Sequence, residues 1–367
     1  MNSKNLQIFF DCGFSKIRAG AFNKDDQNKT FYTESEFFTD QSNLELKIQK
    51  IITFFEKNTN EYIDNINLMI DSSKMLSISI SISKKLDGLK LKQANIQFLI
   101  QEAKQQILKY YTTHNIVHII VNNYKIDDVD YSYLPDEINC HFISLDIFFI
   151  CLPRDLVLYF KNIFSKSNIL INQIICSSYA RSINYKDNLN LNGYISFIDV
   201  GFNKTSIISY VDDKILSLDV LPIGGNHITQ DISKILEKDL EQSEQIKLNF
   251  HQNHQSPNED DIPIKKLQKI IFARTDEILE LCIKSIKSNP LTHSHFKMLL
   301  IGEGSKMLEK CRNNIFFKDI NFLEESSKNI CQSGFKLKMG LNKQVVEIIP
   351  KKLIKQGFFE KLFHFFN

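Results

Sequence analysis

Apolar and polar residues follow two different rhythms along this chain. Between Leu76 and Ser83 an apolar residue and a serine alternate without a break, which predicts a half-buried strand with a serine face. Between Lys265 and Ser288 apolar residues return every third or fourth position, which predicts a long amphipathic helix. Segments of both kinds interleave along the chain, so the pattern predicts an α/β protein.

Further segments with these two periods give an expected order of elements. The order strand, helix, strand, strand is expected over 76–152 and would form a small α/β insert. The other expected elements are a hairpin over 8–22, helices over 44–55, 90–111 and 153–164, strands over 66–70, 117–121 and 142–152, a β block over 194–221, a helical block over 228–248, and a short strand or linker over 345–350.

Three expected strands end in small residues, and two of them also end in an acid. The first carries Asp11–Gly13, the second Asp199–Gly201 and the third Gly302–Ser305. Glycine lets a ligand come close to the backbone, and a carboxylate at a strand end can reach a bound cation. These strand ends are therefore candidate parts of one site.

A fourth candidate part is a glycine pair between a strand and a helix. The strand 218–221 leads into Gly224 and Gly225, and we expect Thr229 and Asp231 to open the helix that follows. Adjacent glycines allow close approach to a phosphate, and a helix N-terminus carries partial positive charge. The segment therefore predicts a phosphate cradle.

Composition narrows the class of protein. The 367 residues are 43% apolar and 24% charged, which is enough for two core-forming halves. A net charge of +2 gives no argument for nucleic-acid binding. The seven cysteines stand singly with no CxxC pair, which is typical of a reducing cytosol and disfavours a cysteine metal site.

Taken in order, these motifs resemble the actin/Hsp70 superfamily and, within it, the bacterial cell-division family FtsA. The resemblance is carried by 11–17, 199–201, 221–232, 243–247, 301–305 and the C-terminal tail. It implies a two-lobed actin-like (ribonuclease H-like) ATPase fold with a small inserted subdomain and a C-terminal amphipathic helix. The division it implies is 1–75 with 152–190 as the first lobe, 76–151 as the insert, 191–235 with 293–340 as the second lobe, 236–292 as its small subdomain, and 341–367 as linker and membrane-targeting helix.

The resemblance also implies that ATP and Mg²⁺ bind between the lobes. Mg²⁺ keeps most of its waters, so Asp11 and Asp199 could hold it through that shell as the catalytic pair. Glu244 and Lys247 would meet the ribose, as their family counterparts do. The full set of expected nucleotide-binding residues is Gly13, Ser15, Lys16, Gly201, Asn203, Gly224, Gly225, Asn226, Glu244, Lys247, Gly302, Gly304 and Ser305.

Several positions depart from the family pattern around this site. Phe202 and Asn203 stand where a glycine run is usual, and Ser206 stands where an acid is common. Glu303 interrupts the adenosine glycines, and Phe14 replaces a small residue. Each change adds bulk or removes charge, so we expect ATP binding with weak or no turnover. Loss of nucleotide binding is the alternative.

The last ten residues, FFEKLFHFFN, form an amphipathic pattern. Six apolar side chains fall within an arc of roughly 160° of a helix: Phe358, Phe359, Leu362, Phe363, Phe365 and Phe366. Three lysines precede them, at 351, 352 and 355, which suits an anionic lipid surface. The pattern predicts peripheral membrane binding, and a helix docked on the protein's own core is the alternative. The resemblance to FtsA implies that the membrane surface is the cytoplasmic face of the inner membrane.

The resemblance implies a scaffold of the division septum. Such a protein would bind ATP, self-associate into filaments and meet other divisome proteins. It would also tether FtsZ by binding the C-terminal tail of FtsZ, and Arg274 stands at the basic position that contacts this FtsZ tail. A PilM-like pilus scaffold and an ATP-dependent kinase of the superfamily are the alternatives. The amphipathic tail favours the division scaffold over the pilus scaffold. The kinase is disfavoured because no motif supplies the carboxylate that would activate the acceptor.

Overall fold

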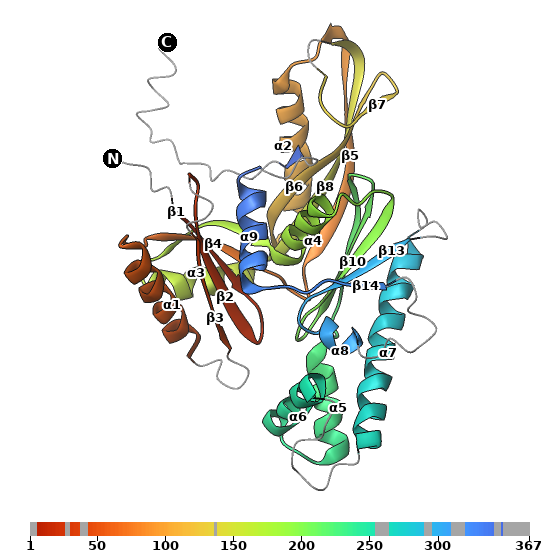
Figure 1. The fold of residues 1–367 in the computed structure, drawn as a ribbon. Helices are drawn as coiled ribbons and strands as arrows, with labels where there is room; N and C mark the ends of the chain where they lie inside the picture. The colour runs from red at the N-terminus through yellow and green to blue at the C-terminus, as the bar shows by residue number, and fades with distance from the viewer. Residues whose placement is uncertain are drawn as a thin grey trace.

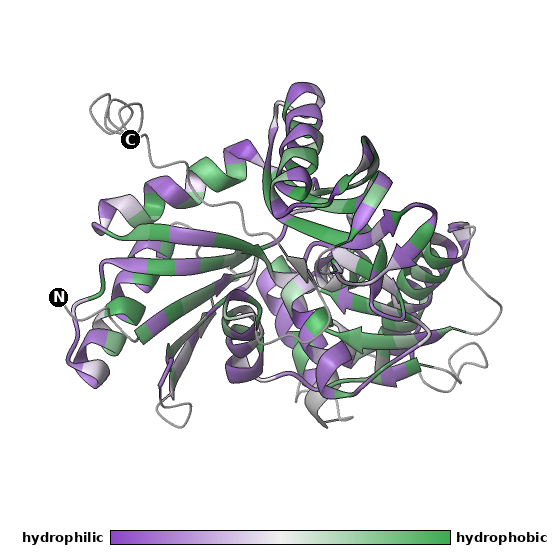
Figure 2. Cartoon of the chain, turned by 90° about the horizontal axis from the view of Figure 1, so that it is seen from above, coloured by the Kyte–Doolittle hydropathy of each residue, from purple (hydrophilic) through white to green (hydrophobic). Residues whose placement is uncertain are grey.

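The computed structural model describes residues 6–25, 30–36, 43–135, 138–253, 264–289, 296–309, 320–340 and 346–347. The strands form three sheets, and helices lie between and around them (Figure 1). Two of the sheets face one another across the middle of the molecule, and the third projects from them with its base in contact with both. In Figure 2 the strands are mainly hydrophobic and the outer helices alternate between the two kinds of residue.

The first sheet has the order β3-β2-β1-β4-β9. Strands β1 (Leu6–Cys12), β2 (Lys16–Asn23) and β3 (Thr30–Glu36) form an antiparallel meander, and β4 (Asn65–Ile70) and β9 (Leu170–Cys176) extend it in parallel with β1. Because carboxyl ends of parallel strands meet at one edge, Asp11, Asp71 and Ser177 gather there. Helices α1 (Leu44–Thr59) and α3 (Arg154–Lys166) pack against this core.

The second sheet repeats this topology with the order β12-β11-β10-β13-β14. Strands β10 (Tyr194–Val200), β11 (Thr205–Val211) and β12 (Lys214–Leu221) are antiparallel, and β13 (Lys297–Ile301) and β14 (Ile320–Phe322) continue in parallel with β10. Asp199 and Gly302 therefore lie side by side at the carboxyl edge of this sheet. The duplicated topology produces two acid-bearing edges.

The third sheet is formed mainly by residues 76–153, which are called the insert below. It has the order β15-β6-β8-β5, and β7 pairs with β6. Its strands are β5 (Leu76–Lys90), β6 (His114–Ile126), β7 (Val129–Tyr131), β8 (Asn139–Pro153) and β15 (Val346–Glu347), and α2 (Gln93–Tyr110) covers one face with its own apolar core. The Asn122 amide donates to the Ile215 carbonyl at 2.7 Å, so the insert is also attached to the second sheet.

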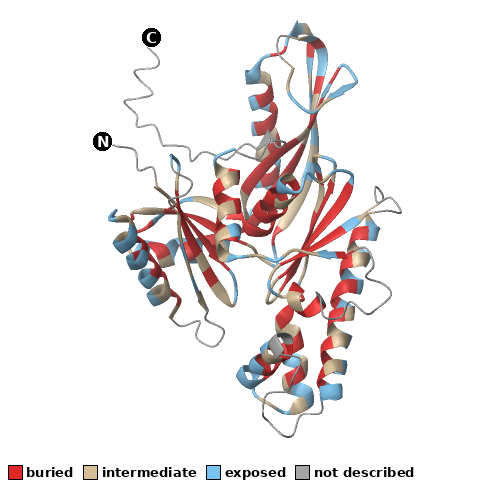
Figure 3. Cartoon of the chain, in the orientation of Figure 1, coloured by how far each residue is buried: buried red, intermediate tan, exposed pale blue. Residues whose placement is uncertain are grey.

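Three helices extend from the other side of the second sheet. They are α5 (Gly225–Leu236), α6 (Leu240–Asn253) and α7 (Ile264–Ser288), and the short α8 (Ser305–Glu309) follows β13. Their inner faces are buried and their outer faces exposed (Figure 3). Helix α5 begins at Gly225, earlier than Thr229, which lies inside the helix with its side chain buried.

Two helices lie in the middle of the molecule. Helix α4 (Ser177–Asn188) is almost wholly buried, and α9 (Ser327–Lys338) packs on β2 and β1. The expected division gave 293–340 to the second lobe, but the buried side of α9 belongs to the first core. The chain therefore crosses back to the first sheet just after β14.

Most expected elements are confirmed, with shifted ends. The strand from Leu76 runs on to Lys90, so the following helix starts at Gln93. The helical block, expected over 228–248, continues to Asn253. The elements that sequence patterns missed are β3, β7, β9, α4, α8, β14 and α9.

Gly334 lets α9 lie directly on the first sheet. A Cβ at this buried position would lie 2.5 Å from the Met69 sulfur and 3.0 Å from a ring carbon of Phe9. We expect Gly334→Ala to lower the free energy of unfolding by about 1–2 kcal/mol, because overpacking outweighs the better helix propensity of alanine. Asn329→Ala, at an exposed position of the same helix, is the control. Equal or greater stability of Gly334→Ala in urea unfolding would contradict this packing.

Candidate functional site

A cavity of about 330 Å³ lies between the carboxyl edges of the first two sheets. It is lined by residues from both halves of the chain, including many that the sequence motifs predict. The predicted residues that line it are Asp11, Gly13, Ser15, Lys16, Asp199, Gly201, Gly225, Glu244, Lys247, Gly302 and Gly304. The other predicted residues, Asn203, Gly224, Asn226 and Ser305, do not line it. The strand-end motifs therefore do converge on one cleft.

Asp11, at the end of β1, is held from two sides. Its Oδ1 accepts a hydrogen bond from the Ser177 hydroxyl at 2.5 Å, and its Oδ2 pairs with Arg18 at 3.1 Å. Arg18 stands directly opposite Asp11 in the β1–β2 register. The same guanidinium reaches Glu303 of the second half at 2.9 Å, and Lys16 also pairs with Glu303 at 2.9 Å. Burial raises the pKa of Glu303, but these two cations outweigh it and lower that pKa overall.

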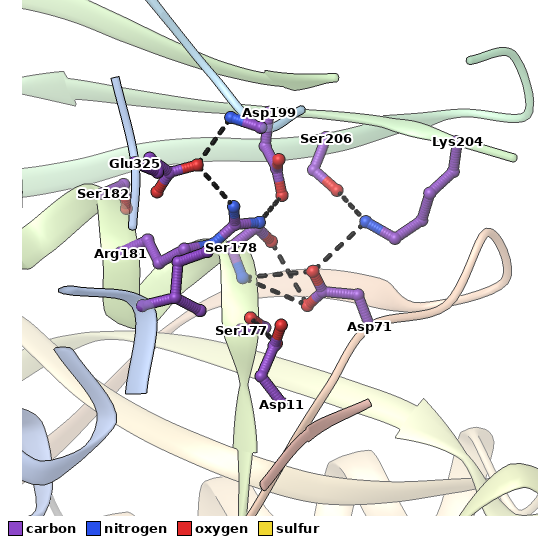
Figure 4. A network of polar contacts seen from close by, with 12 residues as sticks. Asp11, Asp71, Ser177, Ser178, Arg181, Ser182, Asp199, Lys204, Ser206 and Glu325 are labelled. Carbon is purple, nitrogen blue, oxygen red and sulfur yellow. Dashed lines mark hydrogen bonds and ion pairs between the residues drawn. The ribbon is translucent and has the colours of Figure 1, made fainter. Parts of the chain in front are cut away.

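Asp199, at the end of β10, pairs with Arg181 of α4 (Figure 4). The second arm of Arg181 donates to Glu325 at 2.9 Å, and the Gly302 amide donates to the same Glu325 oxygen at 2.6 Å. Burial disfavours the charged form of Arg181, yet Asp199 and Glu325 raise its pKa well above the usual value. Arg181 is therefore a permanent buried cation between two carboxylates.

Another ion pair crosses between the halves at Asp71, which follows β4. Its carboxylate accepts from Lys204 at 3.2 Å and from the Ser178 amide at 3.1 Å (Figure 4). Burial raises the pKa of Asp71, but Lys204 and Arg181 outweigh it and lower that pKa overall. Ser206, which stands where an acid is common in the resembling family, accepts a hydrogen bond from Lys204 at 2.7 Å.

The glycine pair contacts protein backbone at its amides. The Gly225 N–H donates to the Gly201 carbonyl at 3.0 Å, and the Asn226 N–H donates to the Phe202 carbonyl at 2.7 Å. A Cβ at Gly224 would lie 2.5 Å from the Gly201 oxygen. The first amides of α5 are thus engaged with the β10–β11 turn, and the expected phosphate cradle is not formed by them. A glycine that makes room for a ligand cannot be distinguished in sequence from a glycine that makes room for another segment of backbone.

The glycines after β13 have a similar role. Gly302 has a φ of 86°, and a Cβ there would lie 2.5 Å from Asp199 Oδ1. A Cβ at Gly304 would lie 2.7 Å from the Val200 carbonyl, which accepts the Gly304 N–H at 3.0 Å. These contacts fix the edge of the second sheet beside the cavity.

Glu244 and Lys247 form a compact polar pair on α6. The Lys247 ammonium lies 2.6 Å from Glu244, 2.8 Å from the Thr229 hydroxyl and 3.1 Å from the Gly225 carbonyl. Burial lowers the pKa of Lys247, against the opposing effect of Glu244. Both residues line the cavity, and their contact with a ribose stays a prediction.

The predicted Mg²⁺ pair does not fit a hydrated divalent ion in this arrangement. Asp11 and Asp199 each already pair with a guanidinium, from Arg18 and Arg181. A hydrated Mg²⁺ needs carboxylate oxygens that are free to accept from its waters. Two fixed cations at the same carboxylates would also repel it. Among the described residues, no cluster of three or more His, Cys, Asp or Glu side chains could hold a metal.

Arg274, expected to contact a partner, is engaged within the chain. It forms a double hydrogen bond to Asp231 of α5 at 2.6 and 2.9 Å and a third to Glu277 at 2.5 Å. The guanidinium thus joins α7 to α5. Contact with a partner would have to break these bonds.

Several cleft residues were missed by the sequence motifs. They are Arg18, Asp71, Ser177, Arg181, Lys204 and Glu325. The hairpin over 8–22 contained a usable signal, because its register places Arg18 opposite Asp11. Arg181 had none, because the helix that carries it was not predicted.

Solved structures with the same fold belong to the actin-like class. The match to the PilM-PilN type IV pilus biogenesis complex has a TM-score of 0.62 at 11% identity and covers 92% of this chain and 96% of that chain. The match to the ethanolamine utilization protein EutJ from Carboxydothermus hydrogenoformans has a TM-score of 0.50 at 9% identity and covers 91% of each chain. The chain is therefore a protein of actin-like ATPase fold.

Sequence comparison narrows that class. The family model described as cell division protein FtsA matches residues 196–322. Proteins named cell division protein FtsA are 27% identical over 158 residues in Buchnera aphidicola subsp. Schizaphis graminum, 23% over 297 in B. aphidicola subsp. Acyrthosiphon pisum and 29% over 137 in Bacillus subtilis. These matches cover 42%, 71% and 33% of this chain. The resemblance to FtsA is confirmed over these segments.

The matched segments differ in how much of each relative they span. They cover 37% of the first of these proteins, 71% of the second and 31% of the third. None of the helices in the described ranges is long and apolar enough to cross a membrane. The six apolar residues of the expected membrane helix, Phe358 to Phe366, lie outside the described residues.

The Arg274 contacts predict a structural effect of mutation. Arg274→Glu should lower the free energy of unfolding by about 1–2 kcal/mol, because it removes a bidentate pair and places a third carboxylate beside Asp231 and Glu277. Lys269→Glu makes the same charge change at an exposed position of α7 and should have little effect. Urea denaturation of both variants measures the difference, and equal stabilities would show that the α5–α7 contact contributes nothing.

Proposed function

We propose that this chain is an actin-like scaffold of cell division. It binds ATP in the cleft, self-associates, and links FtsZ filaments to the cytoplasmic face of the inner membrane. The observation that carries the proposal is the cavity between two sheets of like topology, because cations from both halves converge on it. The cavity-lining cations are Lys16, Arg18, Arg181, Lys204, Lys247 and Lys306.

The charges support binding of a polyanion with weak or no hydrolysis. Each cavity-lining carboxylate is in an ion pair: Asp11, Asp71, Asp199, Glu244 and Glu303. A general base for water needs an available carboxylate in reach of the nucleophile. The described residues that line the cavity offer none, so the role proposed for ATP is structural.

The proposed FtsZ contact uses the exposed basic face of α7. Lys265, Lys266 and Lys269 are exposed there, while Arg274 is occupied by Asp231. Acidic peptide tails are attracted by such a face through charge complementarity. Filament formation and meeting other divisome proteins follow from the resemblance to FtsA and stay predictions.

A pilus scaffold is the second candidate. The observation in its favour is the likeness to the PilM–PilN structure over 92% of this chain, which shows a shared fold. Binding of the acidic C-terminal tail peptide of FtsZ separates the two, because only the division scaffold is expected to bind it. The kinase alternative gains no support from the cleft, where each described lining carboxylate is paired.

Nucleotide binding is tested at Lys306. This lysine lines the cavity, so Lys306→Glu should weaken ATP binding about tenfold by opposing the phosphates. Lys297→Glu, exposed at the start of β13 and not among the lining residues, should bind ATP as the wild type does. Titration calorimetry measures both. Absence of ATP binding by the wild-type chain would refute the nucleotide site.

The membrane proposal is tested in the C-terminal segment. Phe363→Glu should release the chain from anionic vesicles, because it puts a charge in the apolar arc, where each buried phenylalanine contributes about 1.5–3 kcal/mol. His364→Glu makes a similar charge change on the polar side and should retain most binding. Vesicle co-sedimentation also compares a chain that ends at Pro350. Vesicle binding by the chain that ends at Pro350 would show that another part of the protein contacts the membrane.

A further inference from the structure

We propose that Arg18 and Arg181 take the place of the divalent cation in this cleft, so that the chain binds a nucleoside triphosphate without Mg²⁺. The inference rests on the proposed nucleotide binding and concerns the same cavity. Both arginines line that cavity, and each pairs with one of the two carboxylates that were expected to hold the metal.

Three of the four carboxylate oxygens of the expected metal pair are engaged. Asp11 accepts from Ser177 through Oδ1 and from Arg18 through Oδ2. Asp199 Oδ2 accepts from Arg181, and its buried Oδ1 has no hydrogen-bond partner among the described residues. Asp199 is only 2% exposed, so this one oxygen has little access to the waters of a hydrated ion.

The arginines have the chemistry to replace the ion. A guanidinium stays charged, is more weakly hydrated than an ammonium, and binds phosphate oxygens in a bidentate manner. Arg181 is 7% exposed and fixed between Asp199 and Glu325, and its Nε has no hydrogen-bond partner. Arg18 is fixed between Asp11 and Glu303. Both cations are therefore in position before any ligand arrives.

The fixed cations also explain how a triphosphate can be tolerated without metal. A nucleoside triphosphate brings about four negative charges, and Mg²⁺ normally offsets two of them. Here two arginines supply two positive charges at the carboxylates, and Lys306 adds further charge along the cavity, while Lys16 and Lys204 are offset by Glu303 and Asp71. Mg²⁺ would instead face two like charges at its expected ligands.

The test is titration of the full-length chain with ATP in EDTA and in excess Mg²⁺. We expect dissociation constants that agree within about threefold, because the arginines act whether or not metal is present. Binding at least tenfold tighter with Mg²⁺ would overturn the inference and leave the nucleotide site standing. No binding under either condition would overturn both the proposed nucleotide site and this inference.

A variant reverses the metal dependence. Arg181→Gln leaves Asp199 and Glu325 without their cation, so ATP binding should become at least tenfold tighter with Mg²⁺ than with EDTA. Arg154→Gln, the same change at the exposed start of α3, should keep the wild-type ratio. Circular dichroism checks that each variant folds. If Arg181→Gln does not fold, Arg18→Gln makes the same test at Asp11. A folded variant at Arg181 or Arg18 with an unchanged ratio contradicts the role of that arginine.

Discussion

The buried ion pairs of Arg181 are the contact on which the centre of this molecule depends. This side chain comes from the almost wholly buried helix α4, yet it binds the carboxylate that ends β10 and the Glu325 that precedes α9. Removing one member of a buried charge group leaves the others uncompensated, which costs several kcal/mol. Glu325 also accepts the Gly302 amide, so the same group fixes the loop that closes the second sheet. The ends of the two halves are thus held in one arrangement by charge.

Close backbone contacts make that arrangement compact. Gly224 sits against the Gly201 carbonyl, and Gly302 sits against Asp199, at distances that no side chain would permit. These glycines place α5 and the β13 loop beside the carboxyl end of β10 and the start of β11. The acids and bases of the cleft can then reach one another across short distances, as Lys247 does in meeting Glu244 and Gly225 together.

Sequence patterns predicted the fold well wherever one face of an element is exposed. The serine-isoleucine alternation from Leu76 placed β5 correctly, because one side of that strand is exposed and the other packs on the insert core. Helix α4 could not be found in this way, since it is buried on nearly every side and mixes serine, tyrosine and arginine. Strand-end acids predicted where the cleft lies. Their partners were missed, because Arg181 and Glu325 meet Asp199 only through tertiary structure, and the glycine pair was assigned to a ligand although it contacts backbone.

The attachment of the insert has a mechanical consequence. In sequence the insert leaves the first sheet after β4 and returns to it through α3 and β9, yet Asn122 bonds to Ile215, and Lys214 donates to Asn123 at 3.1 Å, both in the second sheet. A rotation of one half against the other must either break these bonds or swing the insert with it. The long strands β5 and β8 then act as a lever arm: a small change in the opening angle of the cleft becomes a larger displacement at the distal tip of the insert. A change in the opening of the cleft would thereby reach a surface far from it.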